Sequence, residues 1–376
     1  MNFIEEFKKG QAGGNKGLYM GDGVYALNKV LNGLQKARIL TIGAAPKVGK
    51  STFVDYACVI QPYIYAMENN IPVEFIYFSF ELDRISKEFD FAAYFLNHDH
   101  GISTVQLPQG ITKQGLSTLD LSPDYLRGRV LDDNNQTIKI DPKIYEALQI
   151  VYQQRIVPLF GEYSMNGHKL RNGVINFVET RNNPTGLYKF LQYHALQEGV
   201  FVRNGGETNS RITGYKPNNP NKYTIVITDH LRKLIPEQGF QLKQTIDKYI
   251  EYTVELRNLC GYTFVHIIHL NRNLTSIDRL REFEDQLYPN SDDVKDTGNA
   301  AEESDYMITM FNPNDLRYNL TKFFNKKLRD FKGDPKYPHL RSLHLVESRH
   351  CEYPQHFVVN MFGNLKKFEQ VVLDDE

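Results

Sequence analysis

Short apolar segments alternate with segments of helical periodicity along most of this chain. The apolar segments are rich in β-branched and aromatic residues, as strands buried on both faces of a sheet are. They predict strands over 38–42, 73–80, 223–228, 262–270 and 306–311. The helical segments cover about 51–57, 144–154, 186–197 and 243–259. This alternation predicts an α/β fold with a mostly parallel central sheet.

The two ends of the chain depart from this alternation. Two late apolar segments, 343–346 and 357–361, predict a C-terminal β-hairpin. Residues 2–9 fit a short amphipathic helix, which a glycine-rich segment then ends. We therefore expect an arm or linker at the N-terminus and a hairpin that closes the domain at the C-terminus.

The composition is that of a globular protein. The chain has 376 residues, of which 41% are hydrophobic and 24% charged. It can therefore bury a sizeable core, which excludes disordered, fibrous and disulfide-scaffold proteins. We expect an N-terminal arm or linker helix over 1–20 and one α/β domain over 21–376. Within that domain, polar loops without clear periodicity predict a large insertion at about 90–221.

Charge and cysteine content limit the partners and the compartment. The 44 basic and 45 acidic residues give a net charge of −1, so a nucleic-acid site must gather its basic residues locally. Three cysteines form neither a disulfide framework nor a CxxC metal motif, which favours a reducing compartment. No apolar run reaches about 18 residues, and the N-terminus lacks the pattern of a signal peptide. We therefore expect a cytoplasmic protein without a membrane partner.

The strongest chemical motif follows the first predicted strand. Residues 44–51 fit the phosphate-loop pattern, with alanine where the pattern begins with glycine. In such a loop, backbone N–H groups point at phosphate oxygens and the next helix presents its positive N-terminus. Lys50 would reach the β- and γ-phosphates, and the Ser51 hydroxyl would ligate Mg²⁺. The candidate nucleotide-binding residues are Ala44, Ala45, Pro46, Lys47, Val48, Gly49, Lys50, Ser51 and Thr52.

ATP hydrolysis also needs carboxylates, and two of them follow predicted strands. Asp229 ends the strand over 223–228, where a carboxylate can hold Mg²⁺, or can instead cap the next helix. Glu81 ends the strand over 73–80 and is either the group that activates the attacking water or a solvated helix start. Open α/β sheets bind their ligands at the carboxyl ends of the strands. The sequence therefore predicts an ATP site with Mg²⁺ as its cofactor.

The order of these motifs resembles the RecA-like motor domain of DnaB-type replicative helicases. The resemblance covers about 17–90 and 222–370. The phosphate loop matches the family's Walker A motif, and the segment that ends in Glu81 matches the one that carries its catalytic glutamate. The segment around Asp229 matches Walker B. The resemblance implies a RecA-like fold, a catalytic Glu81 and a metal-side Asp229.

Three further segments extend the resemblance to DNA and to a neighbouring subunit. Residues 269–272 read His-Leu-Asn-Arg and are similar to the family's Gln-Leu-Asn-Arg sensor, which implies a sensor role for His269. Residues 291–298 resemble a loop that grips the DNA backbone in the central channel. Glu347-Ser348-Arg349 stands where the family has Lys-x-Arg, whose arginine reaches the neighbour's ATP site, so Arg349 is the candidate arginine finger. The implied DNA-binding residues are Arg272, Lys295, Asp296 and Gly298.

The resemblance implies an ATP-dependent helicase or translocase on single-stranded DNA that serves replication. It implies a homohexameric ring with ATP hydrolysed at the subunit interfaces, and a primase or a loader protein as candidate partners. The family's N-terminal primase-interacting domain is expected to be absent. His269 in place of glutamine and Glu347 in place of lysine leave a second function open. That function is a RecA-like ATPase without unwinding activity, such as a recombination mediator or an assembly switch.

Several of these residues also have simpler interpretations. His269 lies between apolar residues and can be a buried core histidine, and Arg349 can be a solvated residue at a strand end. The run 322–329 mixes cations with aromatic residues, which suits single-stranded nucleic acid. An amphipathic helix with a charged outer face is the favoured interpretation of that run.

Overall fold

The structure is a computed structural model of the whole chain. It describes residues 4, 8, 16–98, 121–132, 134–164, 166, 168–204, 212–270, 287–315, 322–323, 326–327 and 339–371. For residues 295–298, 322–323 and 326–327 only the backbone is described.

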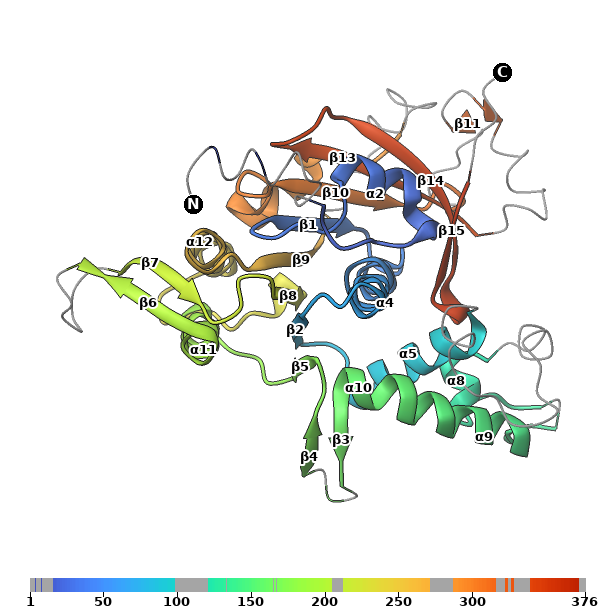
Figure 1. Cartoon of the computed structure of the whole chain (residues 1–376). Helices are drawn as coiled ribbons and strands as arrows, with labels where there is room; N and C mark the ends of the chain where they lie inside the picture. Colours follow the sequence, from blue (N-terminus) through green and yellow to red (C-terminus); the bar gives the residue numbers. More distant parts are fainter. Residues whose placement is uncertain are drawn as a thin grey trace.

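One nine-stranded sheet organises the fold (Figure 1). Its strand order is β15-β14-β13-β10-β1-β9-β8-β2-β5. The six strands from β10 to β5 are parallel, and β13, β14 and β15 add an antiparallel end. The strands are β1 (Ile39–Ala44), β2 (Val73–Ser79), β5 (Ile175–Val178), β8 (Tyr223–Asp229), β9 (Thr263–His269), β10 (Tyr306–Phe311), β13 (Leu340–Ser348), β14 (Gln355–Phe362) and β15 (Lys367–Gln370). The predicted α/β class, the mostly parallel sheet and the C-terminal hairpin are confirmed.

The strands that carry long apolar runs lie close to their predicted positions, whereas short strands escaped prediction. β5 has four residues, of which only Ile175 is fully buried, and β15 likewise buries only Phe368. Such segments lack enough apolar positions to stand out from a loop. Three small two-stranded sheets were also missed. They are β3 (Gly161–Tyr163) with β4 (Lys169–Asn172), β6 (Gly199–Arg203) with β7 (Ile212–Pro217), and β11 (Lys322–Phe323) with β12 (Lys326–Lys327).

The pair β11–β12 corrects one prediction. We favoured an amphipathic helix over 322–329, but Lys322 and Phe323 pair antiparallel with Lys327 and Lys326. Two short strands separated by two residues fit the spacing of a β-hairpin, which the mixed charge pattern did not reveal.

Helices cover both faces of the sheet because alternate residues of its central strands are apolar on opposite sides. Phe75 and Tyr77 of β2 belong to one buried cluster, whereas Ile76 and Phe78 belong to the other. Residues 50–68 form one continuous helical segment on the first face, in which the π-helix η2 lies between two α-helices. The helices of this face are α2 (Tyr25–Leu31), α3 (Lys50–Val54), η2 (Asp55–Ile60), α4 (Gln61–Glu68) and α5 (Arg84–Asn97). The helices α11 (Pro184–Glu198) and α12 (Leu242–Cys260) cover the second face.

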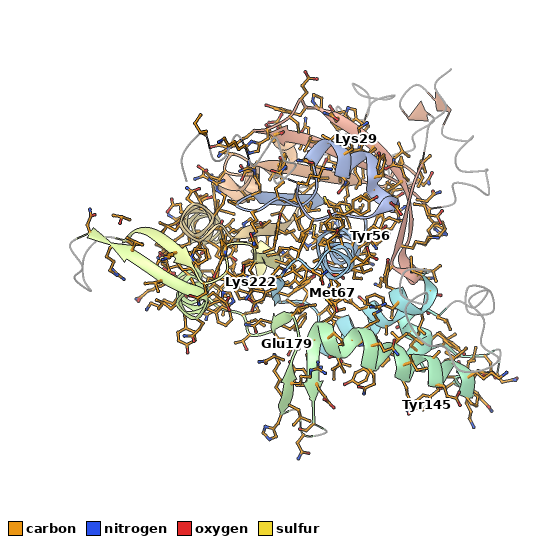
Figure 2. All side chains as sticks on the ribbon, in the orientation of Figure 1. Lys29, Tyr56, Met67, Tyr145, Glu179 and Lys222 are labelled. Carbon is orange, nitrogen blue, oxygen red and sulfur yellow. The ribbon has the colours of Figure 1, made fainter. Side chains whose placement is uncertain are left out.

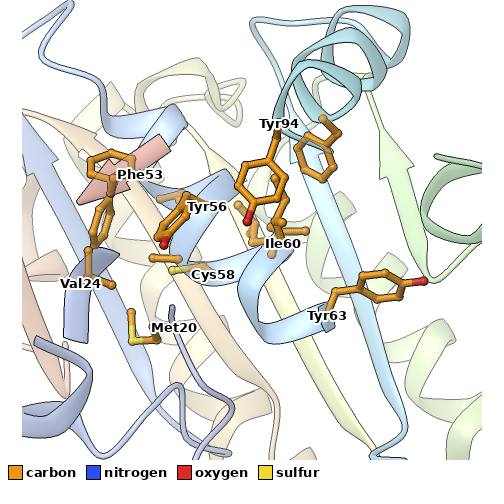
Figure 3. Packing of buried hydrophobic residues seen from close by; sticks show 14 of the residues in the cluster. Met20, Val24, Phe53, Tyr56, Cys58, Ile60, Tyr63 and Tyr94 are labelled. Atoms are coloured by element: carbon orange, nitrogen blue, oxygen red, sulfur yellow. The ribbon is translucent and has the colours of Figure 1, made fainter. Parts of the chain in front are cut away.

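Aromatic side chains fill the first face. Figure 3 shows Phe53 and Tyr56 near Met20 and Val24, with Tyr94 of α5 packing from the other side. The ring centroids of Tyr56 and Tyr94 lie 6.1 Å apart, with the ring planes inclined by 64°. Because the helix that follows the phosphate loop is anchored at so many points, the start of that helix is held in place.

The segment between about 90 and 221 adds structure beyond the sheet. It contains α8 (Pro123–Leu126), α9 (Pro142–Val151), the π-helix η3 (Tyr152–Ile156), α10 (Val157–Phe160) and the ribbon β6–β7, and it supplies the edge strand β5. Figure 1 shows α9 and the ribbon β6–β7 extending away from the sheet. Within the described residues, no helix has both the length and the apolar character needed to cross a membrane.

Candidate functional site

The phosphate loop leaves the carboxyl end of β1 and enters α3 at Lys50. Gly49 precedes that helix with φ of +112°, a conformation that favours glycine. A Cβ atom at Gly49 would lie 2.2 Å from Met361 Sδ in β14, so a side chain has no room there. Ser51 and Thr52 follow, half-buried, in the first turn of α3, while Pro46 and Lys47 are exposed. The loop is therefore tight, supported from β14 and open at its tip.

Lys50 lies beneath this loop and is nearly buried, with 7% of its surface exposed. Its Nζ donates to the Ala45 carbonyl oxygen at 3.2 Å and lies 3.2 Å from His269 Nδ1. Burial lowers the pKa of Lys50 to about 8, although Asp229 and Glu81 oppose that shift. Its ammonium is therefore poised to exchange these neutral acceptors for an anionic one.

His269 ends β9 beside the loop, as the strand register requires. Ala44 of β1 pairs with His269, so the sensor candidate and the phosphate loop leave adjacent strands at the same edge. Burial, together with the charge of Lys50, lowers the pKa of His269 to about 4, so the ring is neutral at pH 7. Because Nδ1 accepts from Lys50, the ring proton lies on Nε2. The ring can thus donate one hydrogen bond from Nε2.

Asp229 and Glu81 lie at the same edge, on β8 and just after β2. Asp229 is 3% exposed and pairs in register with Ser79, two residues before Glu81. His230 and Glu81 are joined by a hydrogen bond of 3.1 Å between Nε2 and Oε1, and Lys233 Nζ lies 3.4 Å from the same oxygen. Burial of Glu81 opposes the shift, but His230 and Lys233 lower the pKa of Glu81 below its ordinary value.

The hydrogen bonds of His230 fix its tautomer. The backbone N–H of Arg232 donates to His230 Nδ1 at 3.2 Å, so the ring proton lies on Nε2 and is donated to Glu81. Burial lowers the pKa of His230, which keeps the ring neutral at pH 7. Its ring meets that of His269 edge to face, with centroids 4.3 Å apart. His230 therefore connects Glu81 to His269, a link that the sequence did not reveal although His230 directly follows Asp229.

Side-chain oxygen and nitrogen atoms that could bind a metal ion thus lie together next to the phosphate loop. The ligand atoms of Glu81, His230 and His269 lie within 4.8 Å of one another. Lys50, Glu81, Asp229 and His269 come from four different strand ends and are brought together by the parallel part of the sheet. Ser51 and Asp229 offer a hydroxyl and a carboxylate, which are oxygen ligands of the kind that Mg²⁺ prefers.

Arg349, by contrast, lies at the opposite ends of the strands, near the amino ends of β1 and β10. Its N–H donates to the Asp305 carbonyl oxygen at 3.0 Å, and Ser348 pairs with Tyr306 at the start of β10. Tyr306 pairs with Leu40, four residues from Ala44, which places Arg349 more than about 13 Å from the phosphate loop at about 3.3 Å per residue.

In this position Arg349 is held by acidic neighbours. Its guanidinium donates to the Glu302 carbonyl oxygen and lies 3.4 Å from the Glu303 carboxylate. Together with Glu302 and Glu347 it lines a cavity of about 390 Å³. The structure therefore does not bring Arg349 to the phosphate loop of its own chain.

The DNA-binding candidates are only partly described. Arg272 lies outside the described residues. Lys295, Asp296 and Gly298 belong to a 3-10 helix, η7 (Ser291–Ala300), for which we had expected a loop. Asn290 starts this helix, because its Oδ1 accepts from the Asp292 N–H at 3.1 Å.

Two residues that sequence reasoning missed support the loop from the C-terminal hairpin. Arg341 Nε donates to the Val48 carbonyl oxygen at 3.1 Å, and Arg341 also donates to Asn312 Oδ1 at 3.1 Å. Met361 packs against Gly49, as described above. No sequence signal could have identified them, because both contacts join positions about 300 residues apart.

Comparison with known proteins shows the fold. No family model matches the sequence, and no curated protein matches it. Among solved structures, an ATPase domain is similar over 98% of this chain and 97% of its own, with a TM-score of 0.59 and 11% identity. A DnaB-like replicative helicase, solved in a study of its interactions with primase, is similar over 98% of this chain and 67% of its own. Its TM-score is 0.61 and its identity 10%. The chain therefore has a RecA-like ATPase fold.

Proposed function

We propose that this protein is an ATP-driven translocase or helicase on single-stranded DNA that works as a ring, with ATP hydrolysed between subunits. The observation that carries the proposal is the separation of the catalytic candidates. Four candidates lie at the carboxyl ends of the parallel strands, namely Lys50, Glu81, Asp229 and His269, whereas Arg349 lies near the amino ends. A second copy of the chain would complete the site by bringing its Arg349 to this phosphate loop.

In the proposed reaction, the N–H groups of the phosphate loop and the Lys50 ammonium bind the ATP phosphates. Glu81 accepts a proton from the attacking water, and His230 and Lys233 hold the Glu81 carboxylate in place. His269 donates from Nε2 toward the γ-phosphate. When bound by Ser51 and Asp229, Mg²⁺ would neutralise phosphate charge. Arg349 of the next subunit would stabilise the charge that develops during transfer.

The DNA side of the proposal rests on the resemblance and on one solved structure. The resemblance assigns Arg272, Lys295, Asp296 and Gly298 to the central channel, and similarity to a DnaB-like helicase structure supports that direction. A homohexamer and a primase or loader partner belong to the same proposal. Phosphoryl transfer depends on the positioning of the reacting groups and on stabilising their charge. A single subunit, which lacks the neighbour's Arg349 at its site, should therefore hydrolyse ATP poorly.

The first test is the ATP hydrolysis rate of the purified full chain with and without single-stranded DNA. We expect strong stimulation by DNA and a loss of roughly 10³-fold or more in Arg349→Ala, the magnitude typical of arginine fingers. Hydrolysis that ignores DNA would instead favour the second function, a RecA-like ATPase that does not unwind DNA.

Mixing two inactive variants tests whether the site is shared. Lys50→Ala lacks the phosphate-binding lysine and Arg349→Ala lacks the finger, so each homo-oligomer should be inactive. In a mixed ring, some interfaces combine an intact Lys50 with an intact Arg349 and should recover part of the activity. No recovery, in mixtures that mass measurement shows to be mixed oligomers, would refute the action of Arg349 across the interface.

A further inference from the structure

A buried ion pair lies beneath the candidate site. Lys87 Nζ donates to both carboxylate oxygens of Asp55, at 2.9 and 2.7 Å, and to the Tyr77 hydroxyl at 2.9 Å. The Tyr77 hydroxyl donates in turn to Asp55 Oδ1 at 2.9 Å. All three donors of the ammonium therefore have partners, and the three side chains form a closed hydrogen-bonded triad.

The triad is secluded from solvent. Lys87 is 0%, Tyr77 1% and Asp55 2% exposed. Burial alone would lower the pKa of Lys87, but the carboxylates of Asp55 and Asp229 raise it above its ordinary value. Lys87 is therefore a cation enclosed in the core, and its charge acts on Asp229 as well as on Asp55.

Its three members come from the elements that build the site. Asp55 lies five residues after Lys50 and is the first residue of the π-helix η2, a helix type that often occurs near functional sites. Tyr77 lies in β2, four residues before Glu81. Lys87 lies in α5, six residues after Glu81. The triad thus connects the helix of the phosphate loop to the segments on both sides of Glu81.

A stabilising role alone does not account for a buried ion pair. Replacing such a pair by apolar side chains of similar size is often neutral or stabilising, because the cost of desolvating two charges is removed. Asp55 and Lys87 lie in helices whose neighbouring residues Val54, Tyr56 and Phe91 belong to the larger core cluster. The carboxylate of Asp90 also acts on Lys87. The directional bonds of the triad do what apolar packing cannot, since they set the distance between three elements.

We propose that Lys87 is a positioning residue, which fixes the segment of Glu81 relative to the phosphate loop through Asp55 and Tyr77. It touches neither substrate nor metal and acts through the two elements that it joins. The kinetic part of this inference rests on the proposed ATP hydrolysis.

The decisive variant is the triple variant Asp55→Leu/Tyr77→Phe/Lys87→Met, which removes both charges and the hydroxyl that they bind, so no member of the triad is left as an unpaired buried group. We expect its unfolding midpoint to stay near that of the wild type and its KM for ATP to change less than threefold. We expect kcat to fall at least tenfold, because Glu81 is no longer held in place while the residues that bind ATP are unchanged. The matched control is Lys222→Met, which breaks the ion pairs of Lys222 (Figure 2) with Glu74 and Glu198 at 2.6 and 2.8 Å. Its kcat should stay unchanged.

Amide hydrogen exchange provides a readout that does not depend on activity. In the triple variant, exchange should accelerate in residues 45–51 and 79–84 and stay unchanged in α12. If the wild type fails to hydrolyse ATP but the triple variant shows this pattern, the proposed function fails and the positioning role stands. If kcat and exchange both match the wild type, the positioning role is refuted. Should the triple variant not fold, the single variant Tyr77→Phe decides by the same two readouts. At least a threefold fall in kcat is expected, and no change in either readout refutes the role.

Discussion

At the scale of single residues, burial determines the charge state of histidine in this protein. His266 in β9 is 0% exposed, and burial lowers its pKa to about 3. His344 in β13 is equally buried, and burial with its neighbour His356 lowers its pKa well below the ordinary value. In the unfolded chain such histidines take up a proton near pH 6.5. Folding therefore competes with protonation in acid.

We predict that His266→Phe makes the stability of the protein less sensitive to acid. The folded pKa lies below the unfolded one, so this histidine favours folding above pH 6.5 and loses that contribution as pH falls toward 3. Between pH 7 and 4.5, the wild type should lose on the order of 2 kcal/mol more of its free energy of unfolding than the variant. Denaturant unfolding at several pH values measures this difference.

The variant suits its site because the rings of Tyr249 and Phe264 lie 5.7 and 5.8 Å from that of His266. The exposed His168 provides the control, since His168→Gln should follow the wild-type pH dependence. Equal pH slopes for wild type and His266→Phe would show that His266 is not the proton acceptor.

At the scale of elements, the C-terminal hairpin supports the phosphate loop. Strand β13 brings Arg341 to the Val48 carbonyl, and strand β14 brings Met361 to Gly49. Both strands belong to the antiparallel end of the sheet, so residues from the end of the chain hold a loop near its beginning. The loop geometry therefore depends on the completion of the whole sheet.

We predict that Arg341→Met weakens ATP binding about tenfold and lowers the free energy of unfolding by about 1.5–3 kcal/mol, the usual range for hydrogen bonds of a charged group. The methionine keeps part of the packing but leaves the Val48 carbonyl without its donor. Titration with a fluorescent ATP analogue measures the affinity.

The control for this variant is Lys366→Met, which breaks the 3.1 Å ion pair with Asp90 but leaves the loop contacts intact. It should bind ATP like the wild type. Unchanged ATP affinity in Arg341→Met would mean that the loop holds its shape without this contact.

The sequence predicts the central strands and the candidate site residues, but not the contacts between distant segments. It predicts the central strands because their apolar runs are long, and it gives Lys50, Glu81, Asp229 and His269 as candidates through the phosphate-loop motif, the strand ends and the resemblance. It could not find Arg341 or the triad of Asp55, Tyr77 and Lys87, because those depend on contacts between distant segments. In the sequence, Lys87 looks like an ordinary surface lysine of a helix, and only the folded structure shows that it is buried.

At the scale of the whole molecule, charge is balanced and any DNA site must be local. The net charge is −1, so no general attraction to a polyanion is available. Binding would then depend on a few phosphate contacts in the candidate segment around η7.

We predict that Lys295→Ala weakens binding to single-stranded DNA and reduces the slope of log affinity against log salt by about 0.7, the value for one phosphate contact. The exposed Lys216 on the ribbon β6–β7 provides the control, and Lys216→Ala should leave both quantities unchanged. Identical salt slopes for Lys295→Ala and the wild type would exclude Lys295 from the DNA contact.

Strand β13 touches its own phosphate loop through Arg341 at one end, and Arg349 follows directly at its other end. These two arginines are eight positions apart, about 27 Å along an extended strand. If Arg349 serves the next subunit, each β13 directly connects two consecutive ATP sites, its own through Arg341 and the neighbour's through Arg349. In a closed ring, these strands would couple every ATP site to the following one, so that nucleotide exchange at one interface would affect exchange at the next interface. If Arg349 serves the next subunit, the sites of such a ring would consume ATP cooperatively rather than independently.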